Sequence, residues 1–203
     1  MGTAFAIQAR TVAAVSTASS NSVLQTVVTT ADVVIRSTTD APDQIWNVVY
    51  ETSAGQKKSE IAVRKDPAAA PGQFQAIAIN YTTRTWGEMN LGGGSIPNPA
   101  TDFLKVFKPS PNGRVRFVGT AVIDGQAAYV INFTGLHDTR STATDWISKA
   151  TMLPIKSVSP GVTVSYQWSG PGSVNPATAW PSVPAGFTKI DPLQAMGKAK
   201  EGL

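Results

Sequence analysis

The sequence predicts a single α+β domain, in which an antiparallel β-sheet packs against two helices. Most of the chain alternates apolar and polar residues with a period of two, the pattern of half-buried strands. Only 15% of the 203 residues are charged, while Thr, Val, Gly and Pro are abundant, which favours strands and turns over surface helices. Hydrophobic residues make up 42% of the chain, enough for one ordinary core, and no linker divides it.

The first segments predict a helix followed by strands. Residues 4–16 carry apolar side chains at helical spacing, so we expect a short amphipathic helix near the N-terminus. The run 23–37 is rich in Val and Thr, which is the composition of strands. Residues 40–43 read Asp-Ala-Pro-Asp and predict a turn, because proline fixes φ and aspartate bonds the nearby backbone.

The next two strands form a predicted hairpin. In the first of them Trp46, Val48 and Tyr50 share one face, and we expect that face to be the buried one. The polar residues 53–56 predict a tight turn. The second strand, over 57–64, alternates apolar residues with charged ones, so we expect it to be half exposed.

The strand over 74–81 is apolar on both faces, which predicts a position inside the sheet with other parts of the chain packed on each side. The Gly- and Pro-rich residues 92–99 end this part of the sheet. Asn98 followed by proline is typical of a helix start and predicts a helix over 98–107. The remaining strands are expected over 115–123, 127–134, 142–148, 153–159 and 161–168.

Four stretches of the chain follow one another in a recognisable order. They are Ile79 to Trp86, which ends in Arg-Thr-Trp, Gly119 to Tyr129, Trp146 to Lys156 with its Leu-Pro-Ile, and Val183 to Thr188. In this order and spacing they resemble the sequences of LolA-like proteins, and none of them is a catalytic signature. We therefore take residues 1–190 as a LolA-like domain and residues 191–203 as a solvated C-terminal tail.

This resemblance implies a highly curved antiparallel half-barrel with helices over its concave face. It also implies a non-enzymatic protein that binds or transports a lipid, an acyl chain or a lipoprotein in a hydrophobic cavity. The partner would be a lipid or a lipidated protein. Proteins of this kind act in the bacterial cell envelope, outside the cytoplasm, and the Arg-Thr-Trp strand is similar to that of actinobacterial members.

Two other functions stay open. In an envelope sensor the same cavity would read a lipid while an outer surface contacts a membrane-bound regulator. The low charge and the high Thr and Ser content would also suit a structural envelope or virion protein without a ligand. The fold alone does not choose between these functions.

Apolar and aromatic side chains alternate along successive strands, so we expect them to line the concave face as a ligand-binding surface. These residues are Trp46, Val48, Tyr50, Ile77, Ile79, Tyr81, Phe117, Tyr129, Ile131, Phe133, Val164 and Tyr166. Alternation assigns side chains to a face but does not say whether that face encloses a cavity or a filled core. Both interpretations stay open at this point.

Enzymatic and metal-dependent functions have little support in the sequence. The chain has no cysteine, and its only histidine, His137, lies in a polar loop. The sequence also has no Gly-x-Ser-x-Gly motif. We therefore expect that the protein is not an enzyme and binds no metal or cofactor. Gly92 to Gly94 lack the lysine of a phosphate-binding loop. Basic residues are spread thinly despite the net charge of +4, which argues against nucleic acid. No apolar run is long enough to span a membrane.

Overall fold

A computed structural model describes residues 2–66, 72–93, 95–107, 114–134, 142–175 and 179–201. The described helices are α1 (Gly2–Asn21), α2 (Pro99–Phe107) and α4 (Pro192–Glu201). The described strands are β1 (Val23–Thr29), β2 (Val33–Asp40), β3 (Ile45–Thr52), β4 (Lys57–Lys65), β5 (Phe74–Asn80), β6 (Thr85–Leu91), β7 (Arg114–Ile123), β8 (Gln126–Thr134), β9 (Thr142–Ser148), β10 (Pro154–Ser159), β11 (Val162–Ser169) and β12 (Thr188–Lys189).

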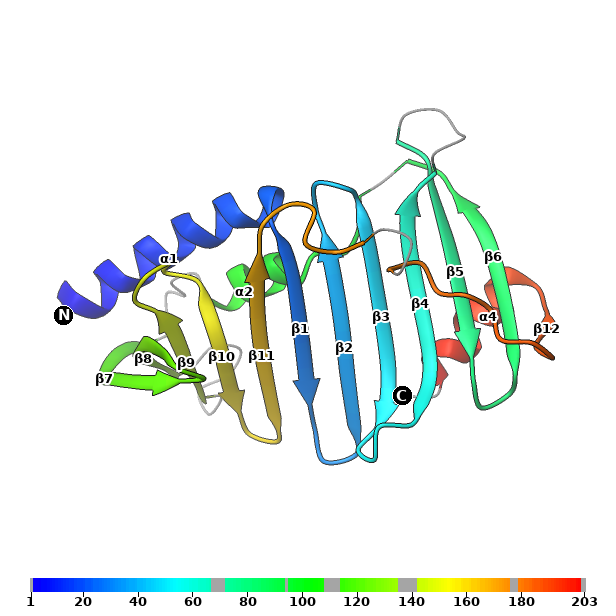
Figure 1. The fold of residues 1–203 in the computed structure, drawn as a ribbon. Helices are drawn as coiled ribbons and strands as arrows, with labels where there is room; N and C mark the ends of the chain where they lie inside the picture. The colour runs from blue at the N-terminus through cyan, green and yellow to red at the C-terminus, as the bar shows by residue number, and fades with distance from the viewer. Residues whose placement is uncertain are drawn as a thin grey trace.

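These strands form one open, mostly antiparallel sheet in the order β12-β6-β5-β4-β3-β2-β1-β11-β10-β9-β8-β7. The sheet consists of two meanders, β1 to β6 and β7 to β11, which are joined where β11 pairs with β1. The helices lie over one side of the sheet, α1 and α2 near one end and α4 near the other (Figure 1). The predicted α+β class, with a curved antiparallel half-barrel, is confirmed.

Local turn chemistry sets the hairpins. Asp124 and Gly125 have φ angles of 49° and 78°, which the two-residue turn between β7 and β8 requires, and this turn joins the two strands expected over 115–123 and 127–134. The Val- and Thr-rich run 23–37 is divided by a second turn, in which the Thr30 N–H donates to the Val33 carbonyl at 3.0 Å. This turn contains neither Gly nor Pro, so the sequence carries no strong signal for it.

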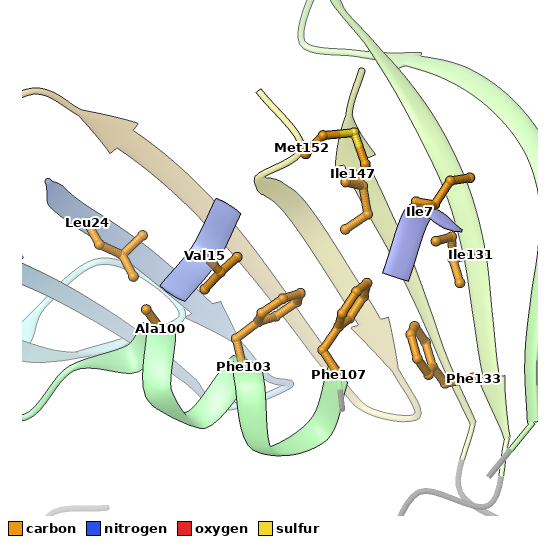
Figure 2. Packing of buried hydrophobic residues seen from close by; sticks show 10 residues of the cluster. All are labelled: Ile7, Val15, Leu24, Ala100, Phe103, Phe107, Ile131, Phe133, Ile147 and Met152. Atoms are coloured by element: carbon orange, nitrogen blue, oxygen red, sulfur yellow. The ribbon is translucent and has the colours of Figure 1, made fainter. Parts of the chain in front are cut away.

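At the β7 to β11 end, α1 and α2 fill the concave face with a packed core (Figure 2). Phe103 and Phe107 of α2 stack with ring centroids 4.6 Å apart. The Phe107 ring lies 4.8 Å from the ring of Phe133 on β8. Val15 of α1 is fully buried in the same cluster. The two predicted helices therefore cover the concave side, as expected.

Side-chain hydrogen bonds join α1 to both ends of α2. The Gln8 Nε2 group donates to the Phe107 carbonyl at 2.7 Å, which satisfies a carbonyl at the C-terminus of α2. The Asn98 Nδ2 group donates to the Ser19 carbonyl at 2.8 Å. Asn98 Oδ1 also accepts the Ala100 N–H at 3.0 Å, so the predicted helix cap is confirmed.

The C-terminal residues, which we expected to be a solvated tail, instead form α4 and pack on the concave face of β4 to β6. Ala195 is only 2% exposed. A Cβ atom on Gly87 of β6 would lie 2.7 Å from the Ala195 Cβ and 2.9 Å from the Pro192 Cα, so the close approach of α4 requires glycine there. The Asn80 side chain also donates to the Lys198 carbonyl at 2.8 Å.

The chain leading to α4 crosses the opposite, convex face of the same strands (Figure 1). β5 therefore lies inside the sheet with α4 on one face and this segment on the other, which confirms the position predicted from its two apolar faces. The convex cluster consists of Ala62, Ile77 and Ile79, with Tyr81, Trp86, Trp180, Val183 and Phe187 packed against it.

Candidate functional site: a cavity on the concave face

Between the two covered ends of the sheet lies a cavity of about 730 Å³. Its floor is the concave face of the strands at the junction of the two meanders, and α2 with the residues before it forms one wall. It is lined by Thr26, Val28, Ile35, Ser37, Trp46, Val48, Pro97, Asn98, Pro99, Asp102, Phe103, Thr142, Ala143, Asp145, Ser157, Ser159, Pro160, Val164 and Tyr166.

The cavity is mainly apolar. Val28 of β1 and Ile35 of β2 are cross-strand partners, and Val164 of β11 lies opposite Val28 on its other side. All three are only partly buried, and they lie outside the neighbouring core that α1 and α2 cover, although Ile35 also packs against the cluster of Val48 and Ala195. This row of aliphatic side chains, together with Trp46 and Phe103, offers an apolar surface that the protein itself leaves partly uncovered.

Asp145 of β9 is the buried acidic group of this cavity. It pairs across the sheet with Ile131 and Ser157, and only 2% of the residue is exposed. The Ser157 hydroxyl donates a hydrogen bond to the carboxylate, but no described group donates to Asp145 Oδ1. Burial raises the pKa of Asp145 to about 7, because desolvation penalises the charged form more than the Ser157 hydrogen bond favours it.

Three further polar side chains, Tyr166, Thr26 and Ser37, face the cavity. Tyr166 of β11 packs against Phe103 with ring centroids 5.6 Å apart, and burial together with the nearby Asp145 charge raises the pKa of its hydroxyl. The hydroxyls of Thr26 and Ser37 bond each other across β1 and β2 at 2.7 Å. These two hydroxyls satisfy each other, whereas the Asp145 carboxylate keeps one oxygen without a donor among the described residues.

The structure divides the twelve residues predicted to line the concave face into three groups. Four of them, Trp46, Val48, Val164 and Tyr166, do line the cavity. Five others share that face but belong to its packed parts: Tyr50 lies beside Val48 and Ile61, while Phe117, Tyr129, Ile131 and Phe133 lie in or against the core under α1 and α2. The concave face thus holds both a filled core and a cavity.

The remaining three, Ile77, Ile79 and Tyr81, were assigned to the wrong face. Ile77 pairs with Ala62, which is next to Ile61 on β4 and therefore points to the other side of the sheet from the Val48 face. These residues pack under Trp180, Val183 and Phe187 on the convex side. The error arose because β5 is apolar on both faces, so alternation alone did not indicate which face was concave.

The sequence analysis missed several cavity residues. For the aliphatic residues Val28 and Ile35 and for the charged residue Asp145, the sequence does contain a recognisable pattern. Val28 lies in phase with Thr26, and Ile35 with Ser37, but the common face of the two strands emerges only once the turn between β1 and β2 is located. Asp145 lies in phase with Ala143 and Ile147, so a charge occupies an apolar position of the strand. A charged residue at such a position is a recognisable sign of a site.

Two other candidate features fall partly or wholly outside the described residues. His137 and its loop lie outside them, as does Gly94 of the glycine run. The end of the loop that follows this run is described, and its Pro97, Asn98 and Pro99 line the cavity. Among the described residues, no group of His, Asp or Glu side chains is arranged to hold a metal ion, and no helix is long and apolar enough to cross a membrane.

No family model and no curated protein sequence matches the chain. Solved structures are similar to it. An uncharacterized conserved protein from Thermus thermophilus has a TM-score of 0.51 at 10% identity, covering 90% of this chain and 98% of that one. Lipoprotein LppX of Mycobacterium tuberculosis has a TM-score of 0.49 at 14% identity, covering 84% and 97%. A LolA superfamily protein from Nitrosomonas europaea has a TM-score of 0.30 at 10% identity, covering 89% and 99%.

The chain shares the fold of the Thermus thermophilus protein. The curved antiparallel sheet with helices over its concave face, which the sequence resemblance implied, is thus confirmed. Identities this low show the architecture alone, so the function must be argued from the cavity of this protein itself.

Proposed function

We propose that this protein binds the apolar chain of a lipid or of a lipidated protein in its concave cavity, as a non-enzymatic carrier. One observation carries the proposal: a cavity of about 730 Å³ lies over aliphatic strand residues that are only partly buried. Sites for small ligands commonly occupy about 300–1,000 Å³ and are lined mainly by apolar side chains. A filled half-barrel would have no such space.

Burial of the chain supplies the binding energy. Each methylene group transferred from water into an apolar site contributes roughly 0.8 kcal/mol, so a chain of about a dozen carbons contributes about 10 kcal/mol. Association and ordering cost at least about 4 kcal/mol of this. A chain of about ten carbons still contributes about 8 kcal/mol, which exceeds this cost, so chains of about ten carbons or longer are the ligands that the cavity can retain.

A tryptophan placed in the cavity tests the proposal. Val164→Trp fills the space over β11, so we expect the uptake of a fluorescent long-chain alkyl probe to fall at least about tenfold in affinity. Ser165→Trp is the matched control, because Ser165 is the next residue of β11, is exposed and points to the other face. Equal binding by both variants and the wild type, with the fold intact by circular dichroism, would overturn the proposal.

The proposal includes a location. The resemblance of the sequence to LolA-like proteins supports a place in the bacterial cell envelope outside the cytoplasm, where a carrier would move lipids or lipoproteins between membranes. Organic extraction of the protein purified from its own cells, followed by mass spectrometry, would identify the natural ligand. Recovery of the protein from the cytoplasmic fraction alone would contradict this location.

A further inference from the structure

This inference rests on the proposed function and concerns the polar end of the ligand. The buried carboxylate of Asp145 lines the cavity, whose surface is otherwise mainly apolar. One of its oxygens, Oδ1, is buried and has no donor among the described residues. Native proteins rarely leave a buried carboxylate oxygen without a partner, because desolvation without a hydrogen bond destabilises the fold.

The groups around Asp145 indicate which chemistry would satisfy it. Ser157 on β10 already donates to the carboxylate, and Tyr166 on β11 lies close enough for the Asp145 charge to raise its pKa. Phe103 of α2 covers Tyr166 and is apolar. The polar end of a bound molecule therefore meets an acceptor oxygen and neutral hydroxyls in a mainly apolar surface.

The charged residues that line the cavity are acidic. Asp145 and Asp102 are the charged residues that line it, and no described lysine or arginine does so. Asp102 is ion-paired with Lys105 at 2.7 Å, but both side chains are mostly exposed, so this pair screens little inside the cavity. A ligand that ends in a carboxylate would bring a second negative charge to Asp145 with no described cation to offset it.

We propose that the cavity selects amphiphiles whose polar end donates a hydrogen bond, an alcohol or an amine, and that this end binds the Asp145 carboxylate. Free fatty acids are then poor ligands, although their chains are equally apolar. Carboxylate acceptors form strong, charge-assisted hydrogen bonds with such donors, while the repulsion of a like charge acts against the acid.

The experiment compares three ligands with the same chain. Decan-1-ol, decylamine and decanoate compete with a fluorescent alkyl probe at pH 8.5, where the Asp145 carboxylate is ionised because its pKa is about 7. For the wild-type protein we expect the alcohol and the amine to displace the probe at concentrations at least about tenfold lower than decanoate. The alcohol distinguishes hydrogen bonding from simple charge attraction, which only the amine provides.

Variants assign the preference to Asp145. Asp145→Asn keeps the shape of the side chain and removes its charge, and Asp145→Leu keeps only its packing. Both variants should reduce the preference for the alcohol and the amine over decanoate to less than about threefold. Asp40→Asn is the matched control and should keep the full preference. Asp40 is also fully buried and also has a carboxylate oxygen without a donor among the described residues, but it does not line the cavity.

The outcomes separate the two proposals. If all three ligands bind the wild type equally, if decanoate binds best, or if the preference persists in both Asp145 variants, this inference is wrong while the carrier proposal stands. If none of the three displaces the probe, or the probe does not bind, the carrier proposal fails and the inference fails with it. Should Asp145→Asn not fold, Asp145→Leu alone decides.

Discussion

Asp145 is the residue at which stability and function are expected to conflict. Its pKa is raised from 3.8 to about 7, so the folded protein holds the proton more tightly than the unfolded chain does. The stability associated with this proton is fully present below about pH 4 and is lost as the pH rises through 7. A shift of about three pKa units corresponds to roughly 4 kcal/mol.

The ligand-free Asp145→Asn variant should therefore become progressively more stable than the wild type between pH 4 and pH 8. Asparagine carries no charge to desolvate, so the difference should grow by up to about 4 kcal/mol over this range. Urea unfolding of both proteins across the range measures it. A difference that does not change with pH would mean that the Asp145 carboxylate titrates as an exposed one.

Single residues also show how far the sequence can be interpreted. Trp46 and Val164 could be placed at the cavity because their strands alternate clearly. Ile79 could not, because the neighbouring residues of β5 are as apolar as Ile79 itself and the covering segment comes from about a hundred residues later in the chain. Burial by a segment distant in sequence leaves no periodic trace at the strand that it covers.

At the scale of elements, the contact between α4 and β6 depends on one glycine. Gly87→Ala places a Cβ within 3.0 Å of Ala195 and Pro192, and part of this contact is backbone that cannot rotate away. We expect a loss of about 1–3 kcal/mol in the free energy of unfolding. Chemical denaturation measures the change.

Gly197→Ala is the matched control for that variant. Gly197 lies in α4 itself, and a Cβ there would meet nothing within 4 Å. Alanine favours the helix over glycine by up to about 1 kcal/mol, so this change should stabilise the protein. If Gly87→Ala were as stable as Gly197→Ala, α4 would not pack closely on β6.

Most strands and two helices could be predicted, whereas α4 could not. Asn98 followed by Pro99 is a strong helix start, and the side-chain cap is present. The residues of α4 include Gly197 and several exposed positions, so the segment resembles a solvated end. Its stability comes from packing on β4 to β6, which only the tertiary structure provides.

At the scale of the whole molecule, the cavity is a consequence of topology. β11 pairs with β1 and joins two meanders, while helices cover the concave face toward either end of the sheet. The strands at this junction keep aliphatic side chains that the helices leave partly uncovered. The sequence predicted the meander, but the position and the acidic character of the cavity depend on pairings between distant strands.

Photolabelling with a diazirine-bearing long-chain alcohol tests the central claim most directly. After irradiation and digestion, mass spectrometry locates the covalent adducts. The expected adducts lie in the peptides that contain Val48, Phe103 and Val164, and both excess decan-1-ol and the Val164→Trp substitution should prevent them. Adducts spread over the convex face, or adducts that neither competition nor Val164→Trp reduces, would contradict a lipid-binding cavity at the junction of the two meanders.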